Sequence, residues 1–166
     1  MTRPLLIGAC PPSWVPPFSH SPLYPHPPGC SGHRLMRWSG LDVFSYLEKF
    51  DRMNLVPDPE YSHKWNREIA TLCAINLLRG GLLRNRRTVL LGRQVHVAFA
   101  AVLPHWPRDI KKVELLKWHP LPKPFAGSSD LAGEVILMPH PSGRSRATQQ
   151  VEVLEKAKMR LRECYQ

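Results

Sequence analysis

Four short segments with the character of strands, separated by segments with helical periodicity, constrain the fold of this chain more than any other feature. Three are apolar runs, Leu5-Leu6-Ile7, Thr88 to Leu91 and Val135 to Met138, and the fourth, Phe50 to Asn54, mixes apolar with charged residues. Each has the length of a buried strand, and each ends at or just before a glycine, an asparagine or a proline. Strands that alternate with helices predict a parallel sheet. We therefore expect a three-layer α/β/α domain around a central, mostly parallel sheet of four strands.

Five segments are expected to be helical. They are Gly32 to Trp38, Leu41 to Leu47, residues 65–79, residues 93–101 and Thr148 to Tyr165. Val113 to Leu116 could add a short strand, and the proline-interrupted stretch after it predicts a loop. The 166 residues suffice for one domain with its own core. That domain spans residues 1–166, with a long proline-rich loop within 1–31 and an amphipathic helix within 147–166.

The charge balance predicts a polyanionic partner. The formal net charge is +10, with 23 Lys and Arg against 13 Asp and Glu. Such an excess favours nucleic acid over other partners. The alternative is a basic surface that serves only solubility.

The remaining composition narrows the class of protein. No apolar run approaches the ~20 residues that cross a bilayer, and the amino terminus has too short an apolar part for a signal peptide. The four cysteines form no C-x-x-C pair, and the eight histidines lack ligand spacing. We expect a cytoplasmic monomer that needs no metal or cofactor and does not contact a membrane.

The turn His140-Pro141-Ser142 is the first candidate for chemistry. It follows the apolar run Val135 to Met138, and prolines at 139 and 141 end that strand. Ligands of open α/β sheets bind at the carboxyl ends of the strands. A histidine held there is a candidate electrophile, base or anion ligand. The alternative is a turn with an exposed imidazole.

Several further turns extend this observation into a family pattern. In chain order they are Gly8-Ala9-Cys10-Pro11-Pro12, the segment from Tyr24 through Gly29-Cys30-Ser31-Gly32 to Leu35, Asn54 at a strand end, Thr88 to Gly92, and His140-Pro141-Ser142. In this order they resemble the uracil-DNA glycosylase superfamily, in its small branches. The resemblance covers residues 4–146. It implies the α/β fold above and cleavage of the bond between a base and its sugar.

The resemblance also assigns roles to individual residues. His140 would donate a hydrogen bond to the base oxygen where charge develops. Asn54 would read the edge of the base beside Gly8, because an amide both donates and accepts. Tyr24 or Phe18 would stack on the flipped base. A last set of positions would contact the DNA backbone: Gly29, Gly32, Ser142, Gly143, Arg144 and Arg146.

Cys10 departs from the family pattern. In well-studied branches this position carries an aspartate or asparagine that orients water, whereas a thiol is a poor base at neutral pH. Gly143 likewise stands where those branches place a bulky wedge. The residues that would bind and stabilise the leaving base are therefore present, whereas the residue that would orient the attacking water is absent.

Three hypotheses for function follow. The first is a DNA glycosylase that removes uracil or a modified pyrimidine. The second is a nucleic-acid-binding module of the same fold with weak or no turnover. The third, a nucleotide hydrolase or transferase, is disfavoured because the chain has neither a G-x-S-x-G elbow nor a P-loop.

Overall fold

The computed structural model describes residues 2–11, 22–58, 61, 65–103, 106, 115–122, 133–142 and 150–166. Most of the expected proline-rich loop lies outside these residues. So do four of the expected site residues, namely Phe18, Gly143, Arg144 and Arg146.

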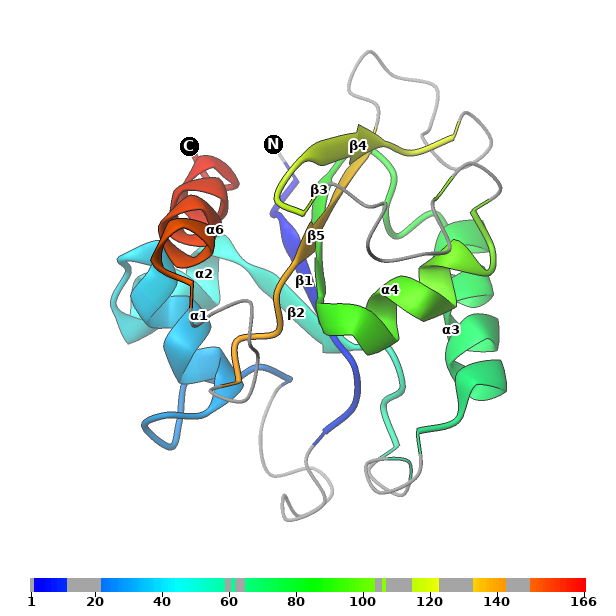
Figure 1. The fold of residues 1–166 in the computed structure, drawn as a ribbon, viewed down its shortest axis with the longest axis horizontal. Helices are drawn as coiled ribbons and strands as arrows, with labels where there is room; N and C mark the ends of the chain where they lie inside the picture. Colours follow the sequence, from blue (N-terminus) through cyan, green and yellow to red (C-terminus); the bar gives the residue numbers. More distant parts are fainter. Residues whose placement is uncertain are drawn as a thin grey trace.

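A mixed, mostly parallel sheet forms the centre of the fold (Figure 1). Its five strands lie in the order β2-β1-β3-β5-β4. Their bounds are β1 Leu5–Gly8, β2 Asp51–Asn54, β3 Arg87–Leu91, β4 Trp118–Pro120 and β5 Glu134–Met138. The pairs β1–β2, β1–β3 and β3–β5 are parallel, and β4 is antiparallel to β5. The four strands predicted from the sequence are the four parallel ones.

The expectation of a four-stranded sheet is wrong by one strand, β4. This strand lies in the stretch predicted as a loop, while the strand expected at Val113 to Leu116 is not found at Leu115 and Leu116, which form a turn. β4 pairs only with β5, so it is an edge strand, and an edge tolerates Pro120 although proline has no N–H to donate. The same proline made the segment look like a loop in the sequence.

All five predicted helices are present, with ends that differ by a few residues. They are α1 Ser31–Ser39, α2 Val43–Lys49, α3 Arg67–Arg79, α4 Gly92–Ala100 and α6 Val151–Glu163. The first three begin with side-chain caps: the side chains of Cys30, Asp42 and Asn66 accept from main-chain N–H groups of α1, α2 and α3. Such caps satisfy donors that a helix cannot satisfy internally.

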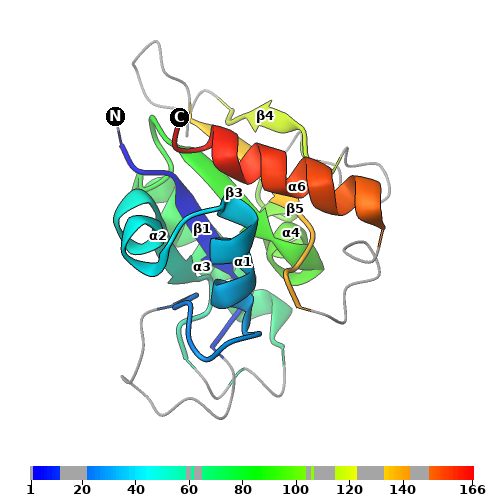
Figure 2. The same ribbon diagram turned by 90° about the vertical axis from the view of Figure 1, so that its left-hand side faces the viewer.

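Apolar clusters lie on both faces of the sheet. In β1, Leu5 and Ile7 belong to the cluster with α3 and α4, whereas Leu6 belongs to the cluster with α1, α2 and α6. Figures 1 and 2 show these two groups of helices on opposite sides of the strands. Because both faces are covered, β1, β3 and β5 contain continuous apolar runs, whereas β2 is only partly buried and carries charged residues.

Candidate functional site

The parallel strands bring Gly8, Asn54 and His140 to one edge of the sheet. Gly8 ends β1 and is paired with Asn54 at the end of β2, and His140 follows β5 after one proline. Neighbouring strands lie about 4.8 Å apart, so three spacings separate the ends of β2 and β5 by about 14 Å. That width can hold a base between two side chains.

The Asn54 side chain lies across Gly8. A Cβ atom built at position 8 would meet Asn54 Oδ1 at 2.9 Å and Leu23 Cδ2 at 3.3 Å. Any larger residue would therefore displace the amide. Gly8 keeps Asn54 in place and joins it to the loop around Leu23.

Gly92 leaves space for the side chain of His140, as Gly8 does for that of Asn54. It has a φ of +86°, which disfavours a side chain, and a Cβ there would lie 2.9 Å from the Cβ of His140. The imidazole therefore packs on the first residue of α4. The sequence places Gly92 in a turn, but does not show that it contacts the histidine.

The hydrogen bonding of His140 defines its tautomer. The main-chain N–H of Ser142 donates to His140 Nδ1 over 3.2 Å. Burial lowers the pKa of His140 below its ordinary value of 6.5. At neutral pH the ring is neutral, with its proton on Nε2, so it presents one N–H donor and carries no charge. Ser142 thus supports the histidine through its N–H group.

The start of α1 is tightly joined to the loop before it. A Cβ at Gly32 would lie 2.2 Å from the carbonyl oxygens of Leu23 and Tyr24, so only glycine allows this approach. The thiol of Cys30 accepts from the N–H of His33 and donates to the Tyr24 carbonyl. The half-buried Tyr24 is thereby held next to the first turn of α1.

Arg34 links this region to the His140 turn. Its Nε donates to the carbonyl of Gly29 at 3.1 Å, and its Nη1 donates to the carbonyl of Pro141 at 3.5 Å. The sequence analysis did not assign a role to Arg34. Contacts 107 residues apart in the chain leave no local pattern that could have revealed it.

The main-chain donors expected to hold phosphate are partly occupied. The N–H of Gly29 donates to His33 Nδ1, and the N–H of Cys30 donates to the Pro27 carbonyl. Ser31 and Gly32 lie in the first turn of α1, where N–H groups have no helical acceptor. A phosphate contact at this loop would therefore involve these two residues.

Cys10 lies beyond β1 and packs against the apolar cluster with α3 and α4. Burial raises its pKa above the ordinary value of 9.0, so the thiol stays protonated at neutral pH. In this state it cannot act as a general base. The structure therefore gives a physical reason why Cys10 does not supply the base that the family pattern has at this position.

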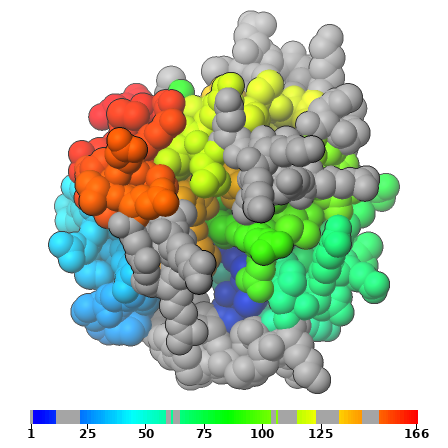
Figure 3. Space-filling model, in the orientation of Figure 1, coloured from blue at the N-terminus to red at the C-terminus, as the bar shows by residue number. Residues whose placement is uncertain are grey.

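The surface is hollowed above the end of β1. Figure 3 shows dark blue atoms of the β1 segment set back beside green residues of α4.

Among the residues that the structure describes, no group of three or more His, Cys, Asp or Glu could hold a metal ion. No described helix has both the length and the apolar character that crossing a membrane requires.

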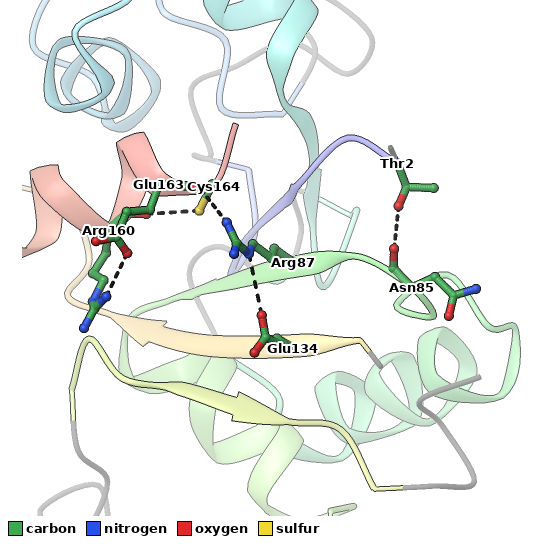
Figure 4. Close-up of polar contacts among 7 residues, drawn as sticks. All are labelled: Thr2, Asn85, Arg87, Glu134, Arg160, Glu163 and Cys164. Carbon is green, nitrogen blue, oxygen red and sulfur yellow. Dashed lines mark hydrogen bonds and ion pairs between the residues drawn. The ribbon is translucent and has the colours of Figure 1, made fainter. Parts of the chain in front are cut away.

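A second hollow, of about 550 Å³, lies at the opposite edge, where the strands begin. Its charged lining consists of Arg3, Glu48, Lys49, Arg86, Arg87 and Glu134. Three of these six residues have an ion-pair partner: Arg86 pairs with Asp51, and Arg87 pairs with Glu134. Figure 4 shows Arg87, which also donates to the Glu163 carbonyl. None of the residues predicted for the site lies here.

No protein-family model matches the chain, and no curated protein matches its sequence significantly. The candidate site therefore depends on its own geometry and on the motifs described above.

Proposed function

We propose that this protein is a DNA glycosylase that removes uracil or a modified pyrimidine by hydrolysing its N-glycosidic bond. The observation that carries the proposal is the neutral His140, with its proton on Nε2, at the same sheet edge as Asn54. One side chain offers a donor for a developing oxyanion, and the other offers a donor and an acceptor for a base edge.

The chemistry follows from these two groups. When the bond between the base and C1′ breaks, both electrons stay with the base, and its carbonyl oxygens gain negative charge. A neutral imidazole N–H stabilises that charge without giving up its proton. The oxygen of a water molecule then bonds to the cationic C1′, and the proton that this water loses passes through solvent to the base anion, so that the products are the neutral base and a C1′ hydroxyl. Tyr24 beside α1 would stack on the base once it is flipped out of the strand.

Several properties support DNA as the substrate. The net charge is +10, and neutralising phosphates makes binding fall steeply with salt. Helices on both faces of the sheet are compatible with the three-layer α/β/α domain that the family resemblance implies. Within this proposal the protein is a cytoplasmic monomer in DNA repair. Gly143, Arg144 and Arg146 would contact the strand beside Ser142.

A second function is favoured by one observation, the protonated thiol of Cys10 in its apolar surroundings. Without a group that activates water, the fold would serve as a nucleic-acid-binding module with little or no turnover. Slow hydrolysis and binding alone are therefore the two outcomes to separate.

An excision assay separates them. Single- and double-stranded oligonucleotides that contain uracil or one of several modified pyrimidines are incubated with the protein, treated with alkali and resolved by size. Strand breaks with the parent protein, lost in His140→Ala, are the expected result. Salt-sensitive binding to a labelled strand without any breaks would favour the binding module. If the protein neither cleaves nor binds, both proposals are wrong.

A further inference from the structure

Arg52 lies below the candidate base-reading residue on the same strand. It is two residues before Asn54 in β2, and side chains two apart point to the same face. Its register partner in β1 is Leu6, two residues before Gly8. Arg52 therefore lies about 7 Å from Asn54 along the strand, on the side of the sheet covered by α1 and α2.

The guanidinium group of the half-buried Arg52 lies over one aromatic ring. Its central carbon lies 5.5 Å from the ring centroid of Tyr46, whose hydroxyl donates to the Leu23 carbonyl at 3.3 Å. Tyr24, the expected stacking residue, interacts with it electrostatically. Arg52 is thus part of the same packed unit as Leu23, Tyr24 and Asn54.

The charge of Arg52 is not balanced by an ion pair in the described part of the chain. Its Nε and Nη1 atoms are buried and make no hydrogen bond there. The adjacent Asp51 interacts with Arg52 electrostatically, but strand alternation directs it to the opposite face, where its carboxylate forms its ion pair with Arg86. Tyr46 is neutral at pH 7, because burial raises its pKa. The ring face of Tyr46 offsets only part of a positive charge.

An unpaired, partly buried cation is costly to keep. Burial lowers the pKa of Arg52, yet a guanidinium remains protonated at neutral pH. Unpaired charges in such places concentrate at functional sites. Tyr46 could instead have been packed against an aliphatic side chain, without this cost.

We propose that Arg52 supplies the positive potential that stabilises the departing base as an anion. This inference rests on the proposed glycosylase function. Because Nε and Nη1 are buried, the effect is Coulombic across a medium of low dielectric and requires no hydrogen bond to the base. The guanidinium keeps its protons throughout, and the electron pair of the broken bond stays on the base.

The proposal predicts a dependence on the leaving group. Uracil leaves as a more basic anion than 5-fluorouracil, so it needs more stabilisation. At matched folding, Arg52→Gln should slow single-turnover excision of uracil by about tenfold, the equivalent of one pKa unit. Excision of 5-fluorouracil should slow less. Arg52→Lys should stay near the parent rate, because it keeps the charge.

Two control variants test folding and net charge. Arg52→Met removes the charge but keeps an apolar stem beside Tyr46, so it covers the case in which Arg52→Gln is poorly folded. Arg79→Gln, at the exposed end of α3, removes one positive charge far from the site and should change nothing. Equal slowing for both bases, or a Lys variant as slow as the Gln variant, would overturn the proposal.

Binding of free bases gives a readout that does not depend on turnover. By calorimetry at neutral pH, the parent should bind 5-nitrouracil, which is anionic there, more tightly than neutral uracil. Arg52→Gln and Arg52→Met should lose that preference. If the preference depends on Arg52 while the parent cleaves no DNA, the glycosylase proposal fails and the inference on Arg52 stands.

The remaining outcomes are also decisive. If the parent cleaves DNA but neither leaving-group dependence nor anion preference changes in the variants, the inference on Arg52 fails alone. If the parent neither cleaves DNA nor binds either base, both proposals fail.

Discussion

Charged side chains are paired differently at the amino edge of the sheet, where the parallel strands begin, and toward the carboxyl edge, where they end. At the amino edge, Arg86 pairs with Asp51, and Arg87 pairs with Glu134, so these cations and carboxylates neutralise each other; Figure 4 shows the second pair. Farther along β2, toward the carboxyl edge, Arg52 has no ion pair among the described residues, and at that edge His140 is held neutral. We infer from this difference that the paired charges at the amino edge stabilise the starts of the strands. Arg52 and His140 have no ion pair, so they are the groups that can act on a ligand.

The largest effect is expected from His140→Ala. Removing the only donor we assign to the leaving base should reduce the excision rate by about 10²-fold or more, the scale of losing one oxyanion donor. Affinity for DNA should change little, because the imidazole faces the base and not the backbone. Rates and affinities are measured on the same oligonucleotide. Equal losses in both would show that His140 supports the fold, like the residues of the amino edge.

Substitutions at the amino edge should lower the stability of the fold and leave the excision rate unchanged. The side chain of Arg86 is only 9% exposed, and it binds both Asp51 and the Arg3 carbonyl. Arg86→Ala should lower the free energy of unfolding by about 2 kcal/mol, because charged hydrogen bonds are lost from a buried position. Excision at matched folding should be unchanged. Urea denaturation and the excision assay provide the two measurements.

Glu134→Gln is the matched control for Arg86. The pair of Glu134 with Arg87 is long, at 3.6 Å, and both side chains are about 40% exposed. Breaking an exposed pair should cost less than about 1 kcal/mol. A large loss of activity with intact stability in either variant would contradict the division between the edges.

The pH dependence of stability tests the buried state of His140. Its pKa is lower in the folded protein than the ordinary value near 6.5, so below that pH the unfolded chain binds the proton first. Stability should therefore rise with pH from the lowered pKa up to about 6.5, and this contribution is flat above it. His140→Gln should remove that part of the slope in thermal melts between pH 5 and pH 7. A variant that keeps the parent's full pH dependence would show that the imidazole is not desolvated.

Much of the fold could be predicted because its signals are local. Three of the four parallel strands, β1, β3 and β5, contain continuous buried apolar runs, and the helices have clear periodicity. The edge strand β4 was missed, because three residues ending in Pro120 have no strand pattern of their own. Only pairing with β5, far along the chain, makes the segment a strand.

The site could be predicted only in part, for the same reason. Gly8, Asn54 and His140 lie at or just after the ends of predicted parallel strands, so topology alone brings them to one edge. Arg34, Arg52 and Gly92 depend on contacts between distant segments, such as the one from Arg34 to the Pro141 carbonyl. An isolated arginine in a strand does not reveal whether its charge will be paired.

The smallest effect on the excision rate is expected from Cys10→Ala. This variant tests whether the carboxyl edge of the sheet contains a residue that orients the attacking water. The protonated thiol packs against apolar side chains, so it contributes no base. Cys10→Ala should leave the excision rate within about threefold of the parent, which is under 1 kcal/mol in the barrier. Cys10→Asp, compared at matched melting temperature, should instead raise the rate, because a carboxylate can orient water and stabilise a cationic sugar. The risk is the cost of a buried carboxylate, which the melting temperature reports. A tenfold or greater loss of rate in Cys10→Ala would show that the sulfur of Cys10 orients the attacking water. The residues that bind the leaving base would then not be the whole of the catalytic site. A folded Cys10→Asp protein no faster than the parent would show that position 10 does not face the sugar.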